Sequence, residues 1–257
     1  MVLENILVDI LLKEENGMIK FLILLLTLLT TTVYSQSNYI PPKAFEYKET
    51  IKLEIIKYFP DLYDYNYIPA LAEQESCISI KHKKCWNSSS QLLSKREQGV
   101  GLFQTTRAFR EDGSVRFDTL QAMKNNYKNE LKDASWSTYK DRPDLQIRAA
   151  ILMLRDDYKK LYNITNFEYR TQMTDAAYNG GLGGVLKERR ACGMSQYCNP
   201  NIWFNNVERY CLKSKKALYG TRSACDINRE HVKTIWEIRL PKYQKQYYIK
   251  EQTSEKR

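Results

Sequence analysis

The 257-residue sequence predicts a mainly α-helical, single globular domain whose long loops are stapled by disulfides. Three observations predict this fold class. Apolar residues recur at helical spacing along most of the chain, alternating strand patterns are scarce, and six cysteines gather in loop-like stretches. Hydrophobic residues make up 43% and charged residues 27%, which is typical of globular rather than disordered chains. Only 10 Gly and 7 Pro exclude collagen-like and Pro/Gly-rich linker proteins.

An apolar run near the N-terminus, residues 21–29 (FLILLLTLL), predicts export. It follows Lys20 and leads to small residues ending at Ser35, the arrangement of a cleavable signal peptide. The run is shorter than the roughly 20 apolar residues of a membrane span. Residues 1–17 carry four acids and one Lys, the wrong sign for the start of a signal peptide, so we expect either a start at Met18 or an added extension. The alternatives are an uncleaved anchor and a buried core helix.

The domain boundaries follow from this segment. Residues 1–35 are the expected extension and signal peptide, 36–42 a short linker, 43–248 one domain and 249–257 a charged tail. Apolar residues spaced three to four apart predict the helices. The expected helices cover residues 43–58, 67–77, 117–131, 144–162, 172–179 and 228–247, with long loops at 77–98 and 188–228.

The charge balance of the chain indicates the class of its binding partner. The chain has 40 Lys and Arg against 30 Asp and Glu, a formal +10, and removal of residues 1–35 makes it more basic. A cationic protein attracts anionic polymers. Because export takes the chain away from nucleic acid, we expect cell-wall material as the partner, with membrane contact only through the signal segment. We expect a monomer, periplasmic, extracellular or associated with the cell envelope.

The cysteines favour disulfides once export is assumed. They lack the C-x-x-C spacing of zinc sites, and the two histidines, His82 and His231, cannot supply a His-rich metal site. Six cysteines allow 15 pairings, and free buried thiols are the alternative. The short spacings favour Cys77–Cys85, Cys192–Cys198 and Cys211–Cys225.

The predicted helix 67–77 carries the first candidate for catalysis. Ile68, Leu71, Ala72 and Glu75 recur at helical spacing, which places Glu75 on the apolar face, while Glu73 is expected in solvent. A carboxyl against an apolar wall has a raised pKa, as a general acid requires at neutral pH. The alternative is a Glu75 at the edge of the face, paired with a Lys or Arg.

Two glycine-flanked segments add candidates for sugar binding. Residues 99–104 (GVGLFQ) end in Gln104, whose amide can bind sugar hydroxyl or acetamido groups. Residues 176–181 (AAYNGG) place Tyr178 and Asn179 before a Gly-Gly break. Each segment alone is weak evidence for a binding site, because Asn-Gly-Gly is often a helix C-cap and Tyr178 can be a core tyrosine.

Together and in this order, Glu75-Ser76, Gly101-Leu102-Phe103-Gln104 and Ala177-Tyr178-Asn179-Gly180-Gly181 resemble the signature of the goose-lysozyme-like, or soluble, lytic transglycosylases. The resemblance covers roughly residues 60–190 and points to an exported bacterial or phage-like member. It implies a lysozyme-like fold. Phe103 replaces the family's usual Met, Gly180 replaces its usual Ala, and the stretch between Glu75 and Gln104 is longer than expected.

The resemblance also implies an activity. Glu75 would act as a single acid and base on the bond between N-acetylmuramic acid and N-acetylglucosamine in peptidoglycan, leaving a 1,6-anhydro end. Tyr178 would hydrogen-bond and orient Glu75, Ser76 would help to fix the loop, and no metal or cofactor is implied. The substrate-binding positions would be Ser76, Gly101, Gln104 and Asn179.

Glu97 keeps a second mechanism open. It precedes the Gly-Val-Gly segment and could hold a water molecule as a second carboxylate, which would make the protein a hydrolytic muramidase. Otherwise Glu97 is a solvated loop charge paired with Lys95 or Arg96. A protein that binds the cell wall without catalysis is the alternative from another functional class.

Overall fold

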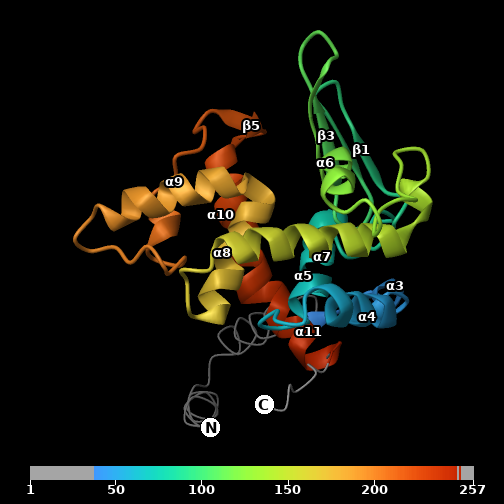
Figure 1. The fold of residues 1–257 in the computed structure, drawn as a ribbon, viewed down its shortest axis with the longest axis horizontal. Coiled ribbons are helices and arrows are strands. Elements are labelled where there is room, and N and C mark those ends of the chain that lie inside the picture. Colours follow the sequence, from blue (N-terminus) through green and yellow to red (C-terminus); the bar gives the residue numbers. More distant parts are fainter. Residues whose placement is uncertain (1–37, 248, 250–257) are drawn as a thin grey trace, which may run out of the picture. The chain divides into compact units, whose positions relative to one another are not determined.

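The computed structural model describes residues 38–247 and Ile249, so the predicted signal segment and nearly all of the charged tail lie outside the described residues. From Ile40 onward the described chain forms one compact unit. Helices dominate it and a small sheet completes it, which confirms the predicted fold class (Figure 1).

The first helices differ slightly from the prediction. A single helix was expected over 43–58, but α3 (Pro42–Phe45) ends before α4 (Lys48–Tyr58) begins. The next helix, α5 (Tyr67–Ser76), matches the expectation closely. Residues 67–73 of α5 are all buried, so this helix is covered on every side along most of its length.

Three helices form the middle of the chain. α7 (Pro143–Lys160) starts with a proline at its first turn, where the missing N–H is not needed. α8 (Phe167–Gly180) begins earlier than predicted because the side chain of Asn166 caps it by accepting from the Tyr169 amide. α9 (Leu182–Gly193) follows after Gly181, whose φ of +80° turns the chain.

The C-terminal segment was expected as one helix over 228–247 but contains a wider turn. α10 (Ala224–Thr234) starts at a capping box of Ser223 and Asp226. A π-helical turn, η3 (Ile235–Arg239), then leads into α11 (Leu240–Gln246). Pro241 accounts for the break, since it lacks the N–H of an α-helical bond and its ring crowds the preceding carbonyl.

A four-stranded antiparallel sheet lies where the sequence predicted a loop and the start of a helix. Its strands follow in chain order: β1 (Gln91–Leu93), β2 (Glu97–Val100), β3 (Thr105–Phe109) and β4 (Val115–Asp118). Phe117 was assigned to a helical face and this was wrong, because it lies exposed on β4. The helix itself, α6 (Thr119–Asn126), begins only after Asp118, whose side chain accepts from the Gln121 amide.

Figure 1 shows α7 crossing between the sheet with α6 on one side and α8, α9 and α10 on the other. One core cluster joins α4, α5, α7 and α11, with Trp86 fully buried in it. A second joins α8, α9 and α10 around Trp203. The smaller elements are η1 (Tyr139–Asp141), η2 (Val207–Arg209) and the hairpin of β5 (Ala217–Tyr219) and β6 (Arg222–Ser223).

The three disulfides are those favoured by the short spacings, namely Cys77–Cys85, Cys192–Cys198 and Cys211–Cys225. They staple the two long loops and are compatible with an exported protein. Among the described residues, no helix has both the length and the apolar character to cross a membrane.

Replacing Gly101 with Ala should destabilise the fold more than replacing Gly113 with Ala. The φ values are +85° and +81°, so either alanine carries left-handed strain of about 1–2 kcal/mol. At Gly101 the added Cβ would also meet Oε1 of Gln146 at 2.1 Å, whereas at Gly113 no described atom lies within 4 Å. We expect a further loss of about 1–3 kcal/mol at Gly101 in the free energy of unfolding by urea. Equal losses would contradict this packing role.

Candidate functional site

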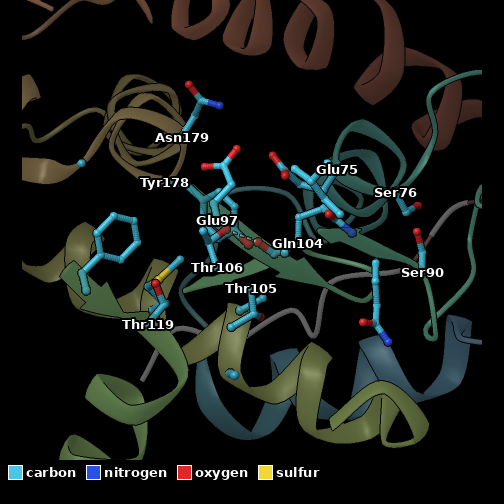
Figure 2. Close-up of a pocket in the computed structure, with 18 of the residues that line it drawn as sticks. Glu75, Ser76, Ser90, Glu97, Gln104, Thr105, Thr106, Thr119, Tyr178 and Asn179 are labelled. Carbon is cyan, nitrogen blue, oxygen red and sulfur yellow. Dashed lines mark hydrogen bonds between the residues drawn. The ribbon is translucent and has the colours of Figure 1, made fainter. Parts of the chain in front are cut away.

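A cleft of about 790 Å³ brings together most of the residues that the sequence singled out. Its walls come from the end of α5, the sheet, the middle of α7, the end of α8 and the β5–β6 hairpin. Figure 2 shows the labelled side chains around this space. Of the predicted site residues, the cleft is lined by Glu75, Ser76, Glu97, Gln104, Tyr178 and Asn179.

Glu75 lies at the C-terminal end of α5 with 17% of its side chain exposed to the cleft side of the fold. Burial raises the pKa of Glu75 above its ordinary value of 4.5. The nearby charge of His231 lowers this pKa, Asp175 raises it and Arg239 lowers it, but burial prevails. The carboxyl therefore keeps its proton to higher pH than an ordinary glutamate, as the apolar helix face predicted.

Glu73 corrects the sequence prediction, because it is fully buried rather than solvated. Its carboxylate accepts from Lys242 Nζ at 2.5 and 2.7 Å, from Tyr243 Oη at 2.7 Å and from Arg239 Nη1. Periodicity treated this side of α5 as the outer face, but α11 and η3 pack over it. Two cations and a phenol make the burial of this carboxylate possible.

Tyr178 lies in the cleft, but its phenol does not donate to Glu75 as the resemblance implied. Its Oη donates to the backbone carbonyl of Phe103 at 2.7 Å, which ties the end of α8 to the turn between β2 and β3. Burial and the charge of Glu75 raise the pKa of Tyr178 well above 10, so the phenol keeps its proton. Tyr178 therefore fixes the cleft wall beside Glu75 rather than holding the carboxyl itself.

Gln104 has a left-handed backbone (φ +44°), and its Nε2 donates to the Gly101 carbonyl at 2.8 Å. This turn fixes its amide on the cleft surface. Gly101 does not line the cleft. Instead the close approach of Gln146, whose Oε1 accepts from the Leu102 amide at 2.9 Å, requires a glycine there.

Ser76 serves the loop more than the cleft. Its Oγ donates to the Ala72 carbonyl at 2.7 Å and accepts from the Trp86 amide at 3.1 Å. The neighbouring Cys77–Cys85 disulfide closes the same loop. Its hydroxyl is thus engaged on both sides, which agrees with a loop-fixing role.

Asn179 lies on the cleft wall, where its Oδ1 accepts from Asn228 Nδ2 at 3.1 Å. Gly180 beside it leaves room for a lysine. A Cβ at Gly180 would lie 2.3 Å from Lys213 Cε and 2.8 Å from Asn228 Nδ2, so an alanine there would force these side chains to shift. Lys213 is held there by the buried Glu188 carboxylate at 2.9 Å.

Glu97 projects from β2 into the same cleft and is only partly buried. Its carboxylate accepts a hydrogen bond from the phenol of Tyr219, which reaches across from the β5–β6 hairpin. The sequence left open a solvated Glu97 paired with Lys95 or Arg96, whereas the structure pairs it with Tyr219. Tyr219 was missed because it lies far along the chain in a predicted loop.

A second group that sequence reasoning missed lies behind Glu75. His231 Nδ1 is 3.4 Å from Glu75 Oε1, and its Nε2 is 3.0 Å from Asp175 Oδ1. Asp175 also accepts from Tyr67 Oη at 3.0 Å and from Trp236 Nε1 at 3.2 Å. The signal was present, since His231 shares an apolar stripe with Val232 and Ile235, but the resemblance ended near residue 190.

No protein-family model, curated protein sequence or solved structure matches the chain. Within the described part of the chain, no group of three or more His, Cys, Asp or Glu side chains is placed to hold a metal ion. Function is therefore inferred from the chemistry of the cleft.

The two glutamates of α5 should respond oppositely to neutralisation. Glu73→Gln leaves Arg239 and Lys242 without their carboxylate, and we expect it to lower the free energy of unfolding by about 3–5 kcal/mol. Glu75→Gln should be neutral or stabilising at pH 7. Urea unfolding of both variants beside the parent measures the difference.

The pH dependence of Glu75→Gln follows from the raised pKa. Between the ordinary value of 4.5 and the raised value, the folded state binds more protons than the unfolded chain, so the parent loses stability as pH rises. The glutamine variant lacks this loss. Its advantage should therefore be present at pH 7 and vanish below pH 4.5. A variant that is less stable at pH 7 than at pH 4, relative to the parent, would contradict the protonated Glu75.

Proposed function

We propose that the protein is a peptidoglycan lytic transglycosylase that uses Glu75 as its single acid and base. The observation that carries the proposal is a carboxyl with a raised pKa set into the wall of a large cleft. The resemblance supports it, because segments around residues 75, 104 and 178 meet at this one cleft although they are far apart in sequence.

The first step uses Glu75 as the acid. Its proton passes to the glycosidic oxygen between N-acetylmuramic acid and N-acetylglucosamine, and the bond from that oxygen to C1 breaks. The 2-acetamido group of the substrate stabilises the positive charge that develops at C1. N-acetylglucosamine leaves with a free hydroxyl, and Glu75 is left as a carboxylate.

The second step uses the same residue as the base. The carboxylate takes the proton of the C6 hydroxyl, whose oxygen closes on C1 to form the 1,6-anhydro ring. Glu75 regains its proton and the atoms balance without water. A single carboxyl serves both steps because donating the proton leaves the base that ring closure requires.

The surrounding residues fit substrate binding. The amides of Gln104 and Asn179, which both line the cleft, offer donors and acceptors to acetamido and hydroxyl groups of a sugar. Tyr178 keeps the end of α8 against the turn at Phe103 and so maintains the width of the cleft. The net positive charge of the chain favours encounter with an anionic wall polymer.

Hydrolysis is the second candidate, and the position of Glu97 favours it. Its carboxylate lines the cleft that Glu75 lines, so a water molecule held between them could attack C1. That muramidase would leave a reducing sugar end. The contact with Tyr219 engages the Glu97 carboxylate, and this supports the lyase over the hydrolase.

Replacing Glu75 with Gln should reduce the clearing of purified bacterial sacculi at least about 100-fold, because the acid and base is lost. The turbidity of a sacculus suspension measures the rate. Glu49→Gln is the matched control, since Glu49 is 70% exposed on α4 and does not line the cleft, and it should clear at the parental rate.

Two outcomes contradict the proposal. Clearing by Glu75→Gln at the parental rate removes Glu75 from the chemistry. A parent chain that binds sacculi without clearing them indicates a cell-wall-binding protein instead of an enzyme.

A further inference from the structure

The imidazole of His231 bridges two carboxyl groups behind the cleft. It comes from α10, while Glu75 comes from α5 and Asp175 from α8. The side chain of His231 is 3% exposed and that of Asp175 is fully buried. Because only Glu75 in this row reaches the cleft, the histidine cannot touch substrate and acts through Glu75.

Asp175 fixes the orientation of the ring. Its carboxylate accepts hydrogen bonds from the phenol of Tyr67 and the indole N–H of Trp236, and it lies within hydrogen-bond distance of Nε2 of His231. Tyr67 and Trp236 both donate to this carboxylate, so it serves here as an acceptor and the proton on this side is assigned to Nε2. Nδ1 is thereby turned toward Glu75 at 3.4 Å. The environment selects the nitrogen that faces the acid.

We propose that His231, oriented by Asp175, is a positioning residue that shares a proton with Glu75 and so sets the pH range in which Glu75 works. This inference rests on the proposed function. With a neutral ring, Nδ1 accepts from the protonated Glu75; when the ring holds that proton instead, its N–H faces the Glu75 carboxylate. Only the first form can donate from Glu75 to the glycosidic oxygen, and the proton that Glu75 then takes from the C6 hydroxyl restores the pair.

The charged and titratable groups around the ring determine the direction in which the pKa of His231 shifts. α5 contributes Tyr67 and Glu75, α8 contributes Asp175 and Tyr178, and η3 contributes Arg239. Burial lowers the pKa of His231, but Asp175 and Glu75 raise it and Arg239 lowers it, with a net rise above 6.5.

The coupling is reciprocal. The His231 charge lowers the pKa of Glu75, and the Glu75 charge raises the pKa of His231. Removing the charge of His231 should therefore raise the pKa of Glu75, and removing the charge of Glu75 should lower the pKa of His231. This behaviour separates a proton-sharing pair from a histidine that only fills space.

The first experiment is the pH profile of kcat/KM for His231→Gln on soluble peptidoglycan fragments. Loss of the ring charge raises the pKa of Glu75, so the alkaline limb should move to higher pH. Loss of positioning should lower kcat roughly 10- to 100-fold. His82→Gln is the control, because the other histidine lies outside the cleft and should leave the profile unchanged.

The second experiment requires neither enzymatic activity nor a substitution at His231. NMR titration of the two histidines, assigned with His82→Gln, compares the parent with Glu75→Gln. We expect the pKa of His231 to lie above 6.5 in the parent and to fall in Glu75→Gln, while the His82 signal stays in place.

The outcomes separate the two proposals. An unchanged His231 titration in Glu75→Gln, or an unmoved alkaline limb in a folded His231→Gln, overturns the proton-sharing pair even if the parent clears sacculi. If His231→Gln fails to fold, the titration alone decides. A coupled pair in a parent that does not clear sacculi instead overturns the proposed function, and with it the role of the pair in that reaction.

Discussion

The buried Glu73 carboxylate is the interaction on which the site depends. An isolated carboxylate in the core would cost far more than the fold can offset, so Arg239, Lys242 and Tyr243 must converge on it. These partners lie in the C-terminal segment. Their convergence locks that segment onto α5, and the preceding α10 is thereby brought behind Glu75.

The same helix therefore carries two glutamates with different tasks. Two positions along a helix correspond to a rotation of roughly 200°, so Glu73 and Glu75 point to nearly opposite sides. Glu73 faces the C-terminal segment and fixes the helix. Glu75 faces the cleft, with His231 and Asp175 as its support. Because one rigid helix carries both carboxyl groups, the contacts that fix Glu73 also fix the position of Glu75 beside His231 and Asp175.

The glycine-flanked segments divide between chemistry and packing. Gln104, Tyr178 and Asn179 line the cleft, whereas Gly101 and Gly180 make room for Gln146 and Lys213 behind its wall. Gly180 also lines the cleft, whereas Gly101 does not. Their missing side chains let Gln146 and Lys213 approach the backbone in the segments that carry Gln104 and Asn179.

Local patterns allowed the prediction of much of this molecule. Apolar spacing predicted α5 and α7, short separations predicted the three disulfides, and the apolar face singled out Glu75. The errors involve long-range contacts. Glu73 meets Arg239 and Lys242 across separations of 166 and 169 residues, which periodicity cannot detect. The sheet was missed because its strands are short and its two edge strands, β1 and β4, are mostly exposed, so hairpin pairing rather than hydrophobic alternation defines them.

Mass spectrometry of the sugars released from purified sacculi most directly tests whether Glu75 alone breaks the strand with the substrate's own C6 hydroxyl as nucleophile. Ring closure predicts muramic acid ends that are lighter by one water and that take up no hydrogen from borohydride. Reducing ends that borohydride converts to the alcohol would show that water attacked C1, and would contradict the single-carboxyl mechanism.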